Sequence, residues 1–299
     1  MTEVGILVGA LLVVTPVALA ATGAESPAAA RPPAVKRAFR TDPDPGWIIS
    51  PGAISRLESA GLSAESTKRF FDNPATLLLS TGGDPRVPDA GLVADFTSGA
   101  ALSAALSDDR VPETVRYVLL DLEHWSFTPE NEQRDPIAAL RAAEQVAAGH
   151  DKQLIFAPAF DLMNVLAPDE PRGPSRWAAF SERVLVPAAE IASVIEIQSQ
   201  STEGTSLATS AVPAAVERIR AAHPGVPVFV GLSTNPDGRR VTAGDLLALV
   251  DATPAAAGYW LNVPEAGRYC PRCGAAQGHV GVAFLDELAA RSGMAAAPS

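Results

Sequence analysis

Short apolar runs alternate with amphipathic segments of helical period along most of this chain, and this alternation limits its fold more than any other feature. Polar stretches separate the two kinds of segment, as in successive β/α units. We expect eight strands, at residues 47–50, 76–80, 91–96, 116–123, 153–158, 193–199, 226–232 and 257–263. Helices are expected at residues 135–148, 175–190, 208–222, 243–250 and 281–291.

Eight strands in a domain of about 250 residues predict a (β/α)8 barrel of the TIM-barrel type, because right-handed crossovers between parallel strands wrap the sheet into a closed form. The links among the first three strands are short or irregular, so an open doubly wound sheet is the alternative. Residues 80–84 do not form the Gly-rich phosphate loop of that fold, and no Walker motif occurs. We therefore predict one barrel domain over residues 47–299 and no cofactor.

The amino terminus predicts export. Residues 5–20 form an uncharged apolar run that ends in Ala18-Leu19-Ala20, an A-x-A cleavage pattern, so we interpret residues 1–20 as a signal peptide. Glu3 precedes the run without any Lys or Arg, which leaves an uncleaved membrane anchor as the alternative. Residues 21–46 are rich in Ala and Pro and predict a flexible tether. The protein is expected to be secreted, or held at the outer face of the cell membrane by this segment alone.

Net charge and cysteine content limit the classes of ligand and of cysteine chemistry that this chain can support. A formal net charge of −11 argues against nucleic acid, whose binding requires clustered Lys and Arg. The two cysteines, Cys270 and Cys273, predict a small disulfide loop in an exported protein. A zinc site with His279 or a redox dithiol are the alternatives, but zinc normally takes four ligands and no second C-x-x-C is present. We predict a monomer without a bound metal.

The strand at residues 116–123 carries the strongest catalytic signal. It ends in Asp121 and Glu123, which point to the same face because side chains alternate along a strand. Two neighbouring acids repel each other and burial disfavours ionisation, so one should keep its proton near neutral pH and could serve as a general acid. Helix capping or pairing with arginine is the alternative. We predict that Glu123 and Asp121 are catalytic.

Further polar and aromatic residues stand where other strands end, which is where a β/α barrel places its chemistry. Aromatic rings beside amides and acids can bind both the flat face and the polar edge of a sugar. An internal polar network and simple core packing are the alternatives. The residues predicted to bind substrate are His124, Trp125, Asp161, Glu196, Gln198, Gln200, Asn235, Trp260 and Asn262.

The apolar strand that closes in Asp121-x-Glu123, with Trp125 two residues later, resembles the D-x-E strand of chitinase-like TIM-barrel glycoside hydrolases. The resemblance implies that Glu123 is the general acid, and that Asp121 tunes it and assists the substrate's acetamido group. The two further aspartates of the family's longer pattern would fall on Arg116 and Leu119. A two-carboxylate retaining mechanism would instead need Glu196 or Asp161 as the nucleophile.

These observations predict a secreted glycoside hydrolase-like protein that acts on a carbohydrate by carboxylic acid catalysis. One alternative is a non-catalytic carbohydrate-binding barrel at the cell surface. The other is a metal-dependent hydrolase that uses His124, Asp121 and Asp161.

Overall fold

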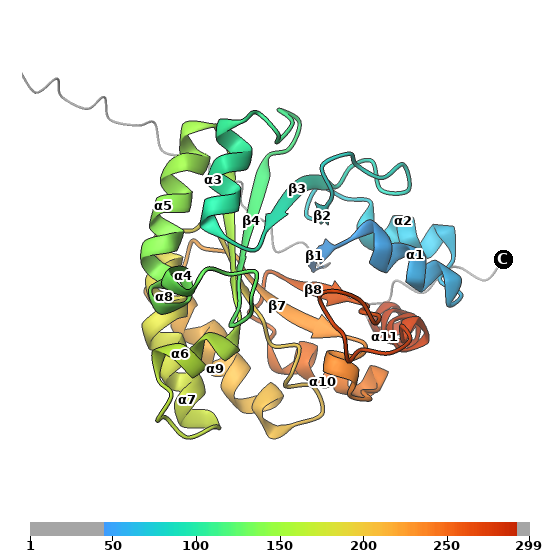
Figure 1. Cartoon of the computed structure of the whole chain (residues 1–299). Coiled ribbons are helices and arrows are strands. Elements are labelled where there is room, and N and C mark those ends of the chain that lie inside the picture. Colours follow the sequence, from blue (N-terminus) through green and yellow to red (C-terminus); the bar gives the residue numbers. More distant parts are fainter. Residues whose placement is uncertain (1–44, 292–299) are drawn as a thin grey trace, which may run out of the picture. The chain divides into compact units, whose positions relative to one another are not determined.

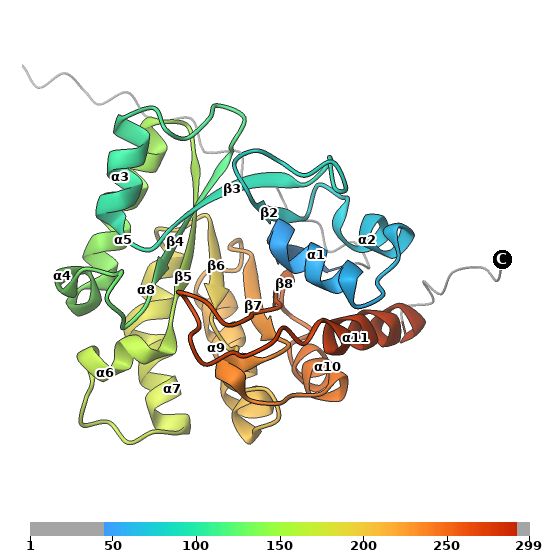
Figure 2. The same ribbon diagram turned by 45° about the vertical axis from the view of Figure 1, so that its right-hand side comes forward.

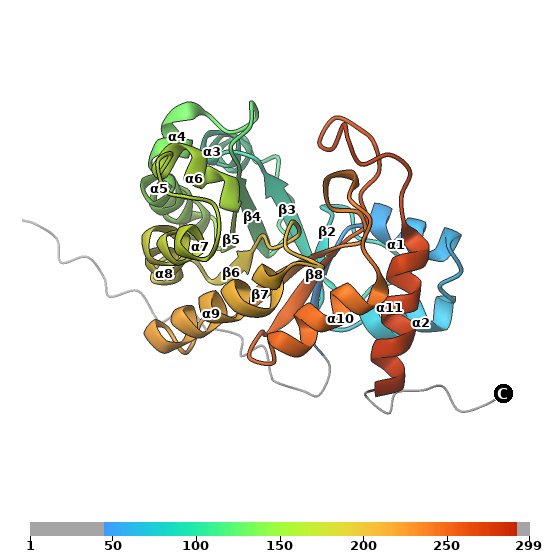
Figure 3. The same cartoon turned by 90° about the horizontal axis from the view of Figure 1, so that it is seen from below.

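Eight parallel strands form a closed barrel in the computed structural model, which describes residues 45–291. Each strand pairs with the next along the chain, and β8 returns to pair with β1. Helices surround the barrel (Figures 1 and 3). The predicted (β/α)8 fold is therefore confirmed, and the open sheet is excluded.

The bounds of the eight strands agree closely with the predicted ranges. The strands are β1 (Gly46–Ile49), β2 (Leu77–Leu79), β3 (Gly91–Phe96), β4 (Tyr117–Leu122), β5 (Gln153–Pro158), β6 (Val194–Ile197), β7 (Val228–Ser233) and β8 (Gly258–Asn262). The helices are α1 (Pro51–Ser59), α2 (Ala64–Phe71), α3 (Gly99–Ser107), α4 (Glu130–Arg134), α5 (Pro136–Gly149), α6 (Met163–Leu166), α7 (Pro174–Phe180), α8 (Val186–Ala189), α9 (Ser206–Ala222), α10 (Ala243–Ala252) and α11 (Gly278–Arg291).

Residues 1–20, the predicted signal or anchor segment, lie outside the described residues. So does the predicted tether, residues 21–46, apart from its last two positions. Within residues 45–291 no helix has the length and apolar character needed to cross a membrane.

The first half of the barrel contains helices that the sequence analysis did not predict. Two helices, α1 and α2, join β1 to β2, and α3 joins β3 to β4. Each begins at a serine whose side chain accepts a hydrogen bond from a backbone N–H of the first turn, namely Ser50, Ser63 and Ser98. These helices have only eight or nine residues, so their periodicity is a weaker signal than their caps.

The core has two layers that follow from the alternation of side chains along each strand. Residues such as Leu119 and Phe229 fill the barrel interior, whereas Leu120 and Leu122 pack outward against the helices. Phe229 occupies the amino-terminal end of the interior, where β1 and β8 each contribute a glycine, Gly46 and Gly258. This end of the interior is thus packed, and a cavity opens at the carboxyl ends of the strands.

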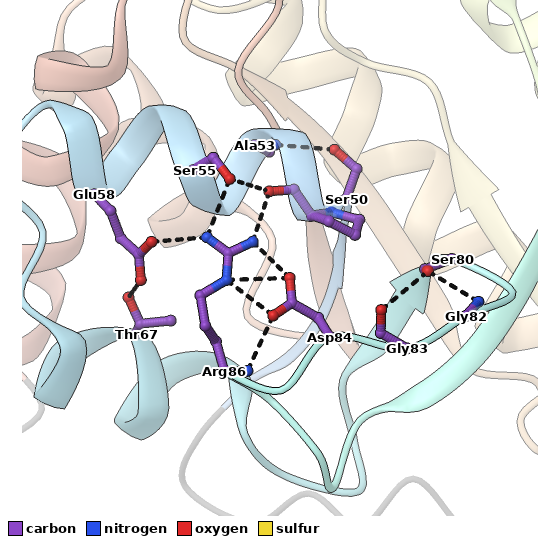
Figure 4. A network of polar contacts seen from close by, with 11 residues as sticks. Ser50, Ala53, Ser55, Glu58, Thr67, Ser80, Gly82, Gly83, Asp84 and Arg86 are labelled. Carbon is purple, nitrogen blue, oxygen red and sulfur yellow. Dashed lines mark hydrogen bonds and ion pairs between the residues drawn. The ribbon is translucent and has the colours of Figure 1, made fainter.

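A loop replaces the helix between β2 and β3, and a single arginine fastens it to α1 (Figure 4). The guanidinium of Arg86 donates to Asp84 Oδ2 at 2.5 Å, to Glu58 Oε2 at 2.7 Å and to the carbonyl oxygen of Pro51 at 3.1 Å. The side chain of Asp84 is only 6% exposed. Its hydrogen bonds with Arg86 lower the pKa of Asp84 from its ordinary value, so both groups are charged.

Arg86→Ala should destabilise the barrel by about 2 kcal/mol, because it leaves the buried charge of Asp84 without its partner. For a domain of this size, that corresponds to a fall of roughly 5 °C in Tm. Thermal unfolding followed by circular dichroism measures the shift. The control is Arg110→Ala, since Arg110 pairs with Asp108 on the open surface and such pairs contribute about 0.5 kcal/mol. Equal shifts in the two variants would show that the Arg86 network does not stabilise the fold.

Candidate functional site

A cavity of about 570 Å³ opens at the carboxyl ends of the strands. Its walls come from the ends of β3, β4 and β8, from the residues after β6, and from the segment between β8 and α11. Active sites of β/α barrels occupy this end, and pockets for small molecules have this size. The cavity is therefore the candidate active site.

Asp121 and Glu123 both line the cavity. Asp121 is the last residue but one of β4, and its Oδ1 accepts a hydrogen bond from Nε2 of Gln198. The same amide nitrogen also donates to the carbonyl oxygen of Ala157 at 2.9 Å, which fixes its orientation. By contrast, no hydrogen bond reaches the carboxyl group of Glu123 from any residue in 45–291. Only one member of the pair has a donor that favours its ionised form.

Burial raises the pKa of both acids. Loss of solvent, reinforced by the charges of Asp95 and Asp161, raises the pKa of Asp121 to about 7, and the hydrogen bond from Gln198 opposes that rise. Loss of solvent, reinforced by the charges of Asp121 and Asp161, raises the pKa of Glu123 to about 9. The two groups titrate as a coupled pair. Near neutral pH, Glu123 is therefore the group that keeps a proton.

Two other acids predicted to bind substrate lie outside the cavity lining. The Oδ1 of Asp161 accepts a hydrogen bond from the backbone N–H of His124 at 2.9 Å, and burial raises the pKa of Asp161. Glu196 is completely buried in β6, and neither of its carboxyl oxygens has a hydrogen-bond partner. Burial first, and then the charges of Asp121 and Glu123, raise the pKa of Glu196 well above its ordinary value, so it is a neutral acid inside the barrel.

His124 and Asn235 are also engaged elsewhere. The ring nitrogen Nδ1 of His124 lies 3.4 Å from Nδ2 of Asn164. The side-chain amide of Asn235 is buried and donates to the carbonyl oxygens of Cys273 and Ala275. Asn235 thus holds the segment after β8 in place instead of facing the cavity.

The structure brings together seven of the eleven predicted catalytic and substrate-binding residues and leaves four outside the cavity lining. The cavity contains Asp121, Glu123, Trp125, Gln198, Gln200, Trp260 and Asn262. His124, Asp161, Glu196 and Asn235 lie outside its lining.

The cavity also contains residues that the sequence analysis missed, among them Asp95, Arg268 and Tyr269. Asp95 stands near the end of β3, so the rule that selected Asp121 could have found it. Arg268 and Tyr269 belong to the long segment after β8, and no local pattern places that segment against the residues after β4.

The predicted disulfide between Cys270 and Cys273 is present in the structure. Cys273 is buried, and its carbonyl oxygen accepts from Asn235. Gly238 has a φ of +79°, and a Cβ atom there would collide with the carbonyl oxygen of Arg272. The disulfide loop is therefore seated on the residues that follow β7.

The metal-dependent alternative requires His124, Asp121 and Asp161 to bind one ion together. Among residues 45–291, no group of three or more His, Cys, Asp or Glu side chains is arranged to hold a metal ion.

Comparison with known proteins identifies no family for this chain. No protein-family profile and no curated protein sequence matches the chain. The carboxyl transferase domain of pyruvate carboxylase from Rhizobium etli is 10% identical with a TM-score of 0.48, over 85% of this chain and 45% of that one. A truncated 3-deoxy-D-arabino-heptulosonate 7-phosphate synthase from Thermotoga maritima is 14% identical with a TM-score of 0.45, over 83% and 87% of the two chains.

Triosephosphate isomerase from Bartonella henselae is 12% identical with a TM-score of 0.39, over 73% of this chain and 92% of that one. These proteins are barrel enzymes that differ in their chemistry. Likenesses this distant say nothing about the activity, which is argued from the cavity.

Proposed function

We propose that the protein is a glycoside hydrolase-like enzyme, in which Glu123 donates a proton to the oxygen of the scissile glycosidic bond. The observation that carries this proposal is the unequal acid pair in the cavity. Glu123 lacks a hydrogen-bond donor and has the higher pKa, whereas Asp121 accepts from Gln198 and has the lower one. A protonated acid beside a carboxylate is the arrangement that cleavage of a glycosidic bond needs.

The two roles follow from the charge that develops during cleavage. As the bond between the anomeric carbon and the leaving oxygen breaks, negative charge grows on the oxygen and positive charge on the sugar ring. Glu123 neutralises the negative charge on the leaving oxygen by transferring its proton to it. The ionised carboxylate of Asp121, held by Gln198, stabilises the positive charge on the sugar ring. Water then supplies the hydroxyl group of the new reducing end, and its remaining proton passes to the carboxylate of Glu123, which restores the acid.

The remaining lining supports a sugar as the substrate. Trp125 and Trp260 supply flat apolar surfaces, and Gln200 and Asn262 supply amide donors and acceptors. The amide of Gln200 lies directly over Gly231 of β7, where any side chain would occupy its place. This close approach fixes Gln200 at the cavity wall.

Export belongs to the same proposal. It is supported by the apolar segment at residues 5–20 and by the Cys270–Cys273 disulfide, because disulfides persist in oxidising compartments. The partner that we propose is a carbohydrate, bound by a monomer without cofactor or nucleic acid.

The decisive experiment is hydrolysis of soluble polysaccharides and aryl glycosides, including N-acetylglucosamine substrates, by the purified protein. Release of new reducing ends or of the aryl group is the expected result. Binding without turnover on every substrate would overturn the catalytic proposal and favour a carbohydrate-binding barrel. A loss of turnover after chelation would instead favour a metal-dependent hydrolase.

We expect kcat/KM to depend on pH as a bell whose two limbs come from the acid pair. Activity should rise with pH as Asp121 ionises, with an apparent pKa of about 7, and fall as Glu123 loses its proton, with an apparent pKa of about 9. Initial rates of aryl glycoside hydrolysis between about pH 5 and about pH 11, roughly two units beyond each limb, measure the profile. An alkaline limb near the ordinary pKa of a glutamic acid would rule out Glu123 as the buried acid.

A further inference from the structure

The rim of the cavity carries a cluster of three aromatic rings and one arginine, which the proposed proton transfer does not use. Trp125 and Phe127 follow β4, whereas Arg268 and Tyr269 come from the segment between β8 and α11. The ring centroids lie 5.0 Å apart for Trp125 and Phe127, 5.3 Å for Phe127 and Tyr269, and 5.9 Å for Trp125 and Tyr269. We call these four residues the rim cluster. Figure 2 shows the segment after β8 reaching across the strand ends.

Of the three rings in the rim cluster, that of Tyr269 is exposed, whereas Trp125 and Phe127 are half-buried. The side chain of Tyr269 is 63% exposed, and no other large hydrophobic side chain in residues 45–291 is exposed. Its backbone is nevertheless held, because Cys270 follows it directly in the disulfide loop that Asn235 binds. An exposed ring on a fixed backbone at the mouth of a cavity is a preformed contact surface for a ligand.

Arg268 is the unusual member of the rim cluster. Its Cζ lies 4.4 Å from the ring centroid of Phe127 and 5.7 Å from that of Tyr269. Within residues 45–291 its guanidinium forms no ion pair and no hydrogen bond. A guanidinium that lies on an aromatic face is held in place by that face, while its N–H edges stay free to bind a carboxylate through two parallel bonds.

The charges elsewhere in the cavity define what Arg268 can bind. Arg56 is the other arginine of the lining, and it is already bonded to Glu265 and to the carbonyl oxygen of Val263. The lining also carries the carboxyl groups of Asp95, Asp121 and Glu123, none of which is bonded to Arg268. An anionic group on a ligand would be repelled near these acids and attracted at the rim.

We propose that the rim cluster is a subsite for a sugar residue that carries a carboxylate, as in a uronic acid. Its ring face would pack on Tyr269 and Trp125, and its carboxylate would pair with Arg268. This inference rests on the proposed function and adds the substrate class: an acidic polysaccharide, bound so that the acidic residue at the rim lies apart from the glycosidic bond at Glu123. A carboxylate is planar and matches the fork of a guanidinium, which a tetrahedral sulfate ester matches less well.

Binding of acidic oligosaccharides to Glu123→Gln, which prevents turnover during the measurement, tests this subsite. The probes are oligogalacturonate, alginate and hyaluronan fragments, each compared by calorimetry with its carboxyl-reduced counterpart. At least one acidic fragment is expected to bind about tenfold more tightly than its reduced form, as a bidentate charged pair can provide. Arg268→Gln should remove that difference and leave affinity for the reduced form unchanged.

The matched control is Arg141→Gln, since Arg141 is exposed on α5. It should keep the preference for the acidic fragment. Equal affinity for acidic and reduced fragments, or an equal loss for both in Arg268→Gln, would overturn the subsite. Equal affinity for a sulfated fragment would overturn its assignment to a carboxylate.

The same pairs of fragments, given to the wild-type protein as substrates, separate the two proposals. Hydrolysis of neutral glycans with no preference for acidic ones would leave the proposed function intact and overturn the subsite. A preference in binding that depends on Arg268, with no hydrolysis of any fragment, would overturn the proposed function alone.

Discussion

Glu123→Gln should lower kcat by about 10²–10⁴-fold on natural glycosides, because a glutamine cannot transfer a proton to the leaving oxygen. The loss should be much smaller on aryl glycosides whose leaving groups are strongly acidic, since their oxygen departs without protonation. Glutamine has nearly the same shape, so KM should change little. Steady-state kinetics on a natural oligosaccharide and on a series of aryl glycosides measure both effects.

The control for this variant is Glu130→Gln. Glu130 lies on α4 and pairs with Arg134 at the surface, so its replacement should leave kcat unchanged. An equal loss on all leaving groups would show that Glu123 contributes something other than its proton. Full activity of Glu123→Gln would remove Glu123 from the mechanism altogether.

The largest effect on stability is expected from Gly258→Ala, at the amino-terminal end of the barrel. A Cβ atom at Gly258 would collide with the carbonyl oxygen of Gly46 on β1 and lie 2.5 Å from the ring of Phe229. The ring is buried in the packed interior and the carbonyl belongs to the neighbouring strand, so neither can move far. We expect a cost of about 3 kcal/mol, or roughly 6–12 °C in Tm.

Gly225→Ala serves as the comparison, because nothing lies within 4 Å of a Cβ atom at that position and its φ is not positive. Its Tm should stay close to that of the wild type. If Gly258→Ala unfolded at the same temperature as Gly225→Ala, the interior would be looser than described. Where Gly258→Ala is destabilised as expected, adding Phe229→Leu should restore part of the lost stability, since it relieves the overlap with the ring.

The barrel could be predicted from the sequence because each strand has a recognisable local pattern. Runs such as residues 226–232 are apolar, short and bounded by polar residues, so their pattern survives without knowledge of the partner strands. The helices α1, α2 and α3 were missed because eight or nine residues hold too few turns to show a period. Their serine caps were the available signal.

The sequence could predict which site residues lie together only where those residues come from the same strand. Asp121 and Glu123 stand two residues apart, and simple alternation brings them to one face. Asn235 shows the limit of this reasoning. It follows a strand as a site residue would, yet its side-chain amide donates a hydrogen bond to the backbone carbonyl oxygen of Cys273. Contacts such as that between Trp125 and Tyr269 join residues 144 positions apart, and nothing local predicts them.

Because the disulfide loop is seated on the residues after β7, the cavity is lined by two kinds of segment: the ends of the barrel strands and a surface segment after β8. Asp121 lies at the end of β4 and Gln198 directly after β6, and a hydrogen bond joins the two side chains. Arg268 and Tyr269 stand on a surface segment that contributes little to the core. With the proposed subsite on that segment, mutations there are expected to change ligand preference without a large loss of folding stability. Related barrels could therefore diverge in ligand choice while the acid pair stays the same.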